Sequence, residues 1–206
     1  MGRPARPTEP ILDAARDLLA AGGTRAATVE AISERGAVSI GSIYYRFSSV
    51  DELLAHMWLR AVGRSHEAAL AVVEDGDAPE DVVLAVALAL YDFCLCEPNE
   101  ARVLATLRAE DLLGRGLSSE LERELREANA AVMPLIDRLA RRCFGRTGGA
   151  GRDLLLLAIV DLPYGAARRQ SQSGGSAHVV RREALATAIE AMLARALAER
   201  GALAAG

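Results

Sequence analysis

The segment from residue 28 to residue 54 constrains the fold more than any other part of the chain. It reads TVEAISERGAVSIGSIYYRFSSVDELL, and Gly36-Ala37-Val38 divides it into two short helical patterns. Thr28 stands where a helix N-cap hydroxyl belongs, and Ser39 offers a second cap after the break. Gly36 suits the end of the first helix because glycine tolerates a positive φ at little cost. The segment therefore predicts two helices joined by a tight turn.

The second of these helices divides its residues between a buried and an exposed side. Ile43 and Phe47 are four residues apart and fall on one face. The other faces carry hydroxyls, phenols, an isoleucine and a guanidinium, namely Ile40, Ser42, Tyr44, Tyr45 and Arg46. Such a helix, held by a small amphipathic helix before it, is typical of a helix-turn-helix motif that can enter a DNA major groove.

These residues also match a known signature. The match is carried by Ala37-Val38-Ser39-Ile40-Gly41-Ser42-Ile43-Tyr44-Tyr45-Arg46-Phe47 and by Ser48-Ser49-Val50-Asp51-Glu52-Leu53-Leu54. Upstream matches are Ile11-Leu12-Asp13-Ala14-Ala15, Gly22 or Gly23, and Thr28-Val29 followed by Ile32. Together they resemble the tetracycline-repressor (TetR) family over about residues 8 to 60, and beyond that only the helical layout supports the resemblance.

The resemblance implies contacts with double-stranded DNA. Phosphates would be met by Thr28, Ser39 and Tyr44, base edges would be met by Ile40, Gly41, Ser42 and Tyr45, and Arg46 would serve a phosphate or a neighbouring carboxylate. Ile40 replaces a residue that is often basic or polar in the family. Val50 stands where the family commonly has a lysine, and the chain contains no lysine at all. We therefore expect one phosphate contact to be lost or moved to an arginine.

The first seven residues form a predicted flexible arm that carries Arg3 and Arg6 among prolines. Basic arms of other helix-turn-helix proteins lie in a minor groove, and these two arginines could do the same. The alternative is an unstructured start with incidental charges, and the sequence does not decide between the two.

Composition favours helices and limits the kind of DNA binding. The chain is 51% hydrophobic but only 4% aromatic, and its net charge is −4, so a protein that coats nucleic acid generally is not expected. Residues 1–50 carry six arginines against five acids, whereas residues 51–206 carry 18 against 23. Three cysteines, no visible signal peptide and no apolar run long enough for a bilayer predict a cytoplasmic protein.

We expect an all-α protein with a flexible arm at 1–7, a helix-turn-helix domain at 8–48 and a larger ligand-binding and dimerisation domain at 49–206. Helix breakers and apolar periodicity place the helices. Outside the helix-turn-helix segment, the predicted helices span residues 8–21, 49–73, 79–96, 99–113, 118–139, 154–167 with a kink at Pro163, and 180–200. The helix at 49–73 would link the two domains.

The larger domain is predicted to hold a ligand cavity, since methionines and aromatics on several helices suit an adaptable apolar pocket. The candidate lining residues are Met57, Trp58, Tyr91, Phe93, Cys94, Leu107, Met133 and Tyr164. Asp92, Asp161 and Arg108 could orient a ligand if they point inward. The alternative is that all of these residues simply form the core.

The last two helices are predicted to form the interface of a homodimer, because together they are more apolar than one domain core requires. The residues assigned to that interface are Leu157, Val160, Leu185, Ile189, Met192 and Leu193.

No pattern indicates a metal, a cofactor or an active site. The spacing in Cys94-Leu95-Cys96 does not suit zinc, and nothing orders His66 and Asp92 beside Cys94 as a catalytic set. The sequence therefore favours a transcriptional regulator, most simply a repressor that a small apolar or amphipathic ligand releases from a palindromic operator. The alternative is a helical small-molecule-binding protein or enzyme whose DNA-binding domain has degenerated, as Val50 and the missing lysines would allow.

Overall fold

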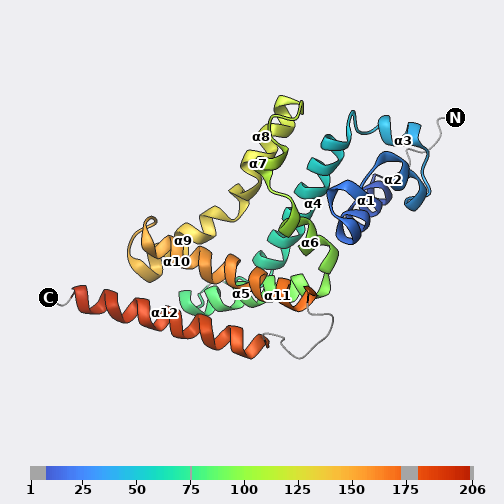
Figure 1. Cartoon of the computed structure of the whole chain (residues 1–206). Coiled ribbons are helices and arrows are strands. Elements are labelled where there is room, and N and C mark those ends of the chain that lie inside the picture. Colours follow the sequence, from blue (N-terminus) through green and yellow to red (C-terminus); the bar gives the residue numbers. More distant parts are fainter. Residues whose placement is uncertain (1–7, 75, 173–180, 205–206) are drawn as a thin grey trace. The chain divides into compact units, whose positions relative to one another are not determined.

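The computed structural model describes residues 8–74, 76–172 and 181–204. Over these ranges the chain consists of helices and turns without a strand, which confirms the all-α fold (Figure 1). The helices are α1 (Glu9–Gly22), α2 (Val29–Arg35), α3 (Ile40–Tyr44), α4 (Val50–Leu70), α5 (Pro79–Cys96), α6 (Pro98–Thr106), α7 (Ala109–Leu112), α8 (Ser119–Glu127), α9 (Met133–Phe144), α10 (Ala150–Leu156), α11 (Leu162–Gln172) and α12 (Arg182–Ala204). Within the described ranges, no helix has the length and apolar character needed to cross a membrane.

The chain divides into two compact units. Unit 1 comprises Met1–Gly63 and Asn99–Ala128, and unit 2 comprises Arg64–Pro98 and Asn129–Gly206. Helix α4 thus gives residues 50–63 to unit 1 and residues 64–70 to unit 2. The expected functional domains at 8–48 and 49–206 divide the chain by role, and that division stays a prediction.

Side-chain caps begin the three helices that follow α1 in unit 1. The Thr28 hydroxyl accepts a hydrogen bond from Ala31 N at 3.2 Å and starts α2. The Ser49 hydroxyl accepts from Glu52 N at 3.1 Å, while the Glu52 carboxylate accepts from Ser48 N at 2.7 Å. These bonds satisfy backbone donors that a helix start leaves without partners. The predicted cap at Thr28 is confirmed, and Ser49 and Glu52 cap α4 in the same way.

The turn between α2 and α3 differs from the expectation. Gly36 has φ −83°, and the positive φ of 49° falls on Ala37 instead. Glycine is needed at position 36 for space, because a Cβ there would lie 3.2 Å from the Pro10 carbonyl oxygen and 3.3 Å from Ala14 Cβ. Gly36 therefore lets α1 approach the end of α2, and Ala37 carries the left-handed conformation, which costs an alanine on the order of 1 kcal/mol.

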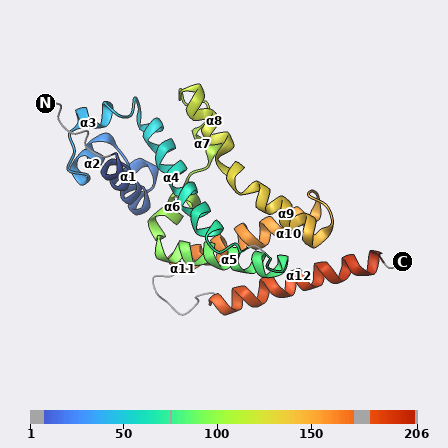
Figure 2. The ribbon, with the colours of Figure 1, turned by 180° about the vertical axis from the view of Figure 1, so that it is seen from behind.

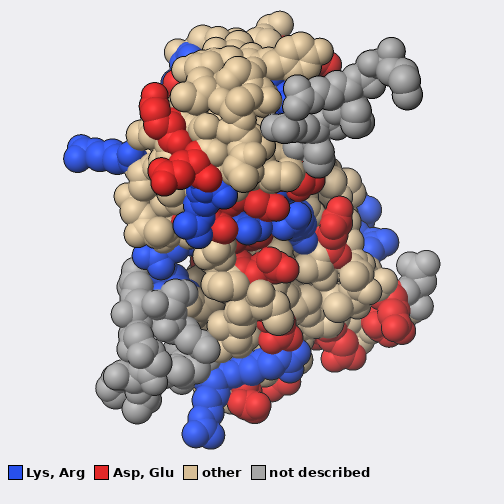
Figure 3. Space-filling view, turned by 90° about the vertical axis from the view of Figure 1, so that its right-hand side faces the viewer, with Lys and Arg blue, Asp and Glu red and all other residues tan. Residues whose placement is uncertain are grey.

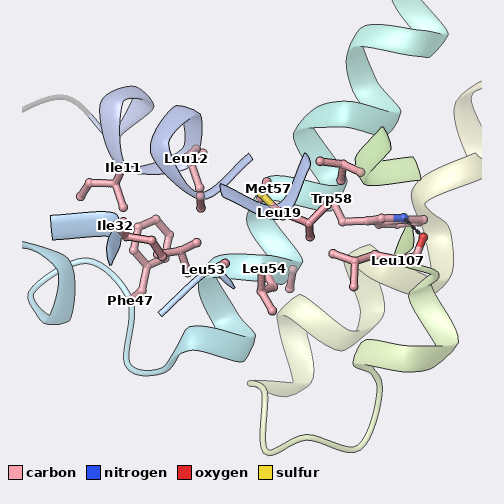
Figure 4. Close-up of a cluster of buried hydrophobic side chains, with 14 of the residues drawn as sticks. Ile11, Leu12, Leu19, Ile32, Phe47, Leu53, Leu54, Met57, Trp58 and Leu107 are labelled. Atoms are coloured by element: carbon pink, nitrogen blue, oxygen red, sulfur yellow. Dashed lines mark hydrogen bonds between the residues drawn. The ribbon is translucent and has the colours of Figure 1, made fainter. Parts of the chain in front are cut away.

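One apolar core holds unit 1 together. Side chains from α1, α2 and the α3 region meet the first half of α4 and the segment after α6 (Figure 4). Trp58 is buried in it, and its indole N–H donates to the Leu107 carbonyl at 3.1 Å. That carbonyl is free to accept because the chain is extended at Arg108. The helix predicted over 99–113 is therefore two helices, α6 and α7.

A buried ion network ties α1 to α4 and α6 within unit 1. Glu100 of α6 is fully buried, and its Oε1 lies 3.2 Å from Arg16 Nη1 and 3.4 Å from Arg60 Nη2. Arg16 also lies 3.1 Å from Asp13, and Arg60 lies 3.0 Å from Asp13 and 2.7 Å from Glu9. A buried carboxylate is tolerated when cations and hydrogen bonds surround it, as here.

Helix α5 is the central helix of unit 2. Apolar residues occupy nearly every side of it, and α9, α11, α12 and the segment before α11 all pack on it. Helix α12 runs beside α5 in both of two opposite views (Figures 1 and 2). The helix predicted over 79–96 is therefore confirmed, and it is packed on several sides.

Other helix boundaries also differ from the prediction. Helix α4 ends at Leu70, before Val73. The helix predicted over 118–139 breaks between α8 and α9, because Pro134 in the first turn of α9 cannot continue a preceding helix. Pro163 disturbs its helix as expected, and the irregularity is a π-helical turn, Leu157–Asp161, one turn earlier.

A pair of glycine variants tests the packing at the turn. Gly36→Ala should lower the free energy of unfolding by about 1–3 kcal/mol, because the added methyl group forces α1 and α2 apart. Gly41→Ala is the control, since nothing lies within 4 Å of a Cβ there, and it should leave stability unchanged or raise it by up to about 1 kcal/mol. Urea unfolding followed by circular dichroism measures both. Equal effects would contradict the account.

Candidate DNA-binding surface

Helix α3 begins at Ser39, whose hydroxyl accepts from Ser42 N at 3.2 Å. The two serine hydroxyls also share a hydrogen bond of 2.8 Å. Both side chains are therefore used locally to start this short helix. Their contacts with DNA stay predictions. Such contacts would use the remaining lone pairs of the two hydroxyl oxygens and the backbone.

The two sides of α3 differ as the sequence predicted. Ile43 and Phe47 are buried in the unit 1 core. On the other side, the exposed fractions are 42% for Ile40, 55% for Tyr44 and 86% for Tyr45. Three large side chains with apolar parts are thus exposed close together on one short helix, and contiguous exposed apolar surface often marks an interaction site. We name Ile40, Gly41, Tyr44 and Tyr45 the outer face of α3.

Arg46 follows α3 and points back along it. Its Nη1 donates to the Ser42 carbonyl at 3.1 Å, and the side chain is half-buried. This bond satisfies one carbonyl at the end of the short helix. Thr28 is exposed at the start of α2, with its hydroxyl engaged as the cap. Arg3 and Arg6 lie outside the described residues.

Val50 is the first residue of α4, and it packs against the unit 1 core. At this position, where the TetR family commonly has a lysine, this chain therefore has a valine that stabilises the fold. Acidic and basic side chains are intermixed on the face shown in Figure 3, and they do not form one basic surface there. Any attraction for DNA must come from a small local surface.

The eight predicted ligand residues are divided between the two units. Met57, Trp58 and Leu107 belong to the tightly packed core of unit 1, as the alternative interpretation anticipated. The rest belong to unit 2, namely Tyr91, Phe93, Cys94, Met133 and Tyr164. Of the three polar candidates, Asp92 is bound to Arg182 with Nε–Oδ distances of 3.1 and 3.0 Å, and Arg108 is exposed.

Two of the surface hollows in the described part of the chain are lined by none of those eight residues. One, of about 150 Å³, lies in unit 2 between the loop after α4 and the side of α9, and Val82, Arg138 and Arg142 help to line it. The other is a shallow depression in unit 1 between α1 and the end of α2. Both are small or open compared with ordinary ligand pockets.

Unit 2 contains polar groups inside its apolar interior. Burial raises the pKa of the Cys94 thiol to about 12, so the thiol is protonated and unreactive at neutral pH. Burial also raises the pKa of Tyr164, the nearby Cys94 adds to this, and a hydrogen bond with Ser65 opposes it. Burial lowers the pKa of His66, and a hydrogen bond with Asn129 opposes it. Cys94, His66 and Asp92 thus have different partners and form no catalytic set.

The predicted dimer residues fall into two groups. Leu185, Ile189 and Leu193 are buried within the single chain, where α12 packs against α5, and Met192 is half-buried. The first three therefore contribute to the core of their own chain, and their assignment to a dimer interface stays a prediction. Leu157 and Val160 remain 40% and 37% exposed.

The ion pairs of Glu100 with Arg16 and Arg60 were not predicted from the sequence. A glutamate in the first turn of a helix is normally exposed, and only its tertiary partners Arg16 and Arg60 reveal its role. Within the described residues, no group of three or more His, Cys, Asp or Glu side chains could hold a metal ion.

Comparisons with known proteins agree with this geometry. Residues 11–57 match the family model described as bacterial regulatory proteins, tetR family. No curated protein matches the sequence. Among solved structures, a transcriptional regulator from Rhodococcus sp. Rha1 is 22% identical, with a TM-score of 0.68 over 91% of this chain and 94% of that one.

Two further structures show the same fold. A TetR family regulator from Marinobacter aquaeolei VT8 has a TM-score of 0.71 at 17% identity, over 90% of this chain and 93% of that one. FadR from Bacillus subtilis, solved in complex with stearoyl-CoA, has a TM-score of 0.67 at 17% identity, over 91% and 97%. The matched family consists of bacterial regulatory proteins, so the match favours a transcriptional regulator over an enzyme. Residues 11–57 of this chain are therefore a helix-turn-helix segment of the tetR family of bacterial regulatory proteins.

Proposed function

We propose that the chain is a homodimeric repressor whose α3 helices read a palindromic operator and whose unit 2 binds the ligand that releases it. The observation that carries the proposal is the outer face of α3, which presents Ile40, Tyr44 and Tyr45 to solvent while Ile43 fixes the helix in the core. Thr28, Ser39 and Tyr44 would meet phosphates, and Ile40, Gly41, Ser42 and Tyr45 would meet bases. Arg46 would hold Ser42 in place through its hydrogen bond to the Ser42 carbonyl.

A single helix of this length reads too few bases for useful affinity. Two copies placed about 34 Å apart would meet successive major grooves, so a two-fold dimer suits the proposal. Leu157 and Val160 are large exposed apolar residues at the π-helical turn, and we assign them to the contact between copies. Apolar residues also remain on the outer side of α12, where Met192 and Leu197 are only partly covered.

The ligand proposal rests on the interior of unit 2. Tyr91, Phe93 and Cys94 on α5 face a core that also receives Tyr164 from α11, and the Tyr164 and Ser65 hydroxyls supply polar tips. These residues line neither of the two hollows described above, and we propose that the side chains of unit 2 move apart to admit the ligand. A neighbour in fold, FadR, binds stearoyl-CoA, so an amphipathic acyl thioester is the first class to try here.

A matched pair of caps tests the DNA-binding role of α3. Ser39 and Ser118 both accept a hydrogen bond from a backbone N–H at 3.2 Å, so either change to alanine should lower stability by about 1 kcal/mol. Only Ser39→Ala should also weaken binding to a duplex selected from a randomised library. Fluorescence anisotropy measures the affinity, and binding should saturate at two chains per palindrome. Equal affinities for both variants and the parent would refute a role for this end of α3.

The dimer assignment has its own test. Leu157→Arg should shift the protein from dimer to monomer in sedimentation equilibrium, because it places an unpaired charge in the proposed contact. Leu70→Arg, at a similarly exposed leucine outside that contact, should not. A Leu157→Arg dimer as tight as the parent would show that the interface lies elsewhere.

The ligand proposal predicts reciprocal coupling. Stearoyl-CoA should weaken operator binding, and the operator should weaken stearoyl-CoA binding by the same factor; a tenfold effect corresponds to about 1.4 kcal/mol. Coenzyme A alone and stearate alone are the controls, and Tyr164→Phe should reduce the response. Isothermal titration of free and operator-bound protein measures the factor. Equal ligand affinity in the two states would exclude release by this ligand.

A further inference from the structure

The outer face of α3 lacks the side chains that usually read bases. Specific contacts in the major groove are most often made by Arg, Lys, Asn or Gln, which form paired hydrogen bonds with guanine or adenine. From Gly36 to Ser49 the only such residue is Arg46. Its guanidinium donates to the Ser42 carbonyl at 3.1 Å, so it is already engaged at the end of its own helix.

The serines of α3 are also engaged. The Ser42 hydroxyl lies 2.8 Å from the Ser39 hydroxyl, which in turn accepts from Ser42 N. What α3 offers outward is one aliphatic side chain, two phenols and the bare backbone of Gly41. Nothing lies within 4 Å of the point where a Gly41 Cβ would be, so the space beside Ile40 is open.

The major groove has one apolar group that can match such a surface, the 5-methyl group of thymine. Ile40 and Tyr44 are one helical turn apart and lie on one side of α3, with Gly41 and Tyr45 beside them. A branched aliphatic side chain that is 42% exposed at the start of this helix gains by covering a methyl group, since burial of apolar surface is favourable.

We propose that Ile40 is a specificity-determining residue that recognises thymine in each half-site by packing on its 5-methyl group. The absence of Cβ at Gly41 lets the base edge approach, and Tyr45 closes the far side of the contact. The inference rests on the proposed entry of α3 into the major groove. It goes further by naming the base and the atom that are recognised.

Uracil in place of thymine removes only the 5-methyl group, which makes the test selective. The probe is the tightest duplex selected by the full-length protein from a randomised library, with each thymine replaced singly by deoxyuridine. At one thymine per half-site, the replacement should weaken parent binding about three- to tenfold, the effect of one buried methyl group. In Ile40→Ala the same replacement should change affinity less than twofold. Ile40→Leu should stay sensitive to it.

The outcomes separate this inference from the proposed function. If no uracil weakens the parent while Tyr45→Ala abolishes binding, α3 reads DNA without methyl recognition and the inference is wrong. The inference also fails if Ile40→Ala stays as sensitive to uracil as the parent, or if selection returns half-sites with no preferred thymine. If Ile40→Ala and Tyr45→Ala fold by circular dichroism and bind every duplex as the parent does, the proposed function itself is overturned.

Discussion

The burial of Ile43 and Phe47 is the constraint on which the DNA-binding surface depends. A helix as short as Ile40–Tyr44 is unstable alone, because helix nucleation costs more than so few hydrogen bonds return. The core of unit 1 supplies what is missing by receiving these two side chains. Once they point inward, the helical periodicity places Tyr45 on the opposite side, and Ile40 in the first turn is also exposed. The surface that we propose meets DNA thus follows from the packing beneath it.

That packing is held in turn by contacts from distant parts of the chain. Gly36 allows α2 to close on α1, and α1 carries Arg16, which meets the buried carboxylate of Glu100. Arg60 of α4 meets the same carboxylate. An unpaired buried charge is strongly destabilising, so any movement of α6 must be accommodated by both arginines. The position of the helix-turn-helix segment therefore depends on a residue in α6.

Features that depend on residues within one turn of helix could be predicted from the sequence, whereas features that depend on tertiary contacts could not. The Ser39 cap and the disturbance at Pro163 follow from rules that act within one turn of helix. The positive φ at Ala37 was assigned to the neighbouring glycine, because sequence cannot distinguish a need for space from a need for conformation. The burial of Glu100 needs partners far away in the chain. Leu193 shows the same limit, since an apolar stripe does not say whether it covers its own chain or another.

The central claim is that the outer face of α3 lies in the major groove. Photocrosslinking tests it most directly, with 5-iododeoxyuridine in place of individual thymines of the selected duplex, because the iodine occupies the position of the methyl group and reacts with an adjacent aromatic ring. Mass spectrometry of the crosslinked peptide should identify Tyr45 or Tyr44, the two exposed tyrosines of this segment. Efficient crosslinks confined to residues outside 28–47 would contradict the account.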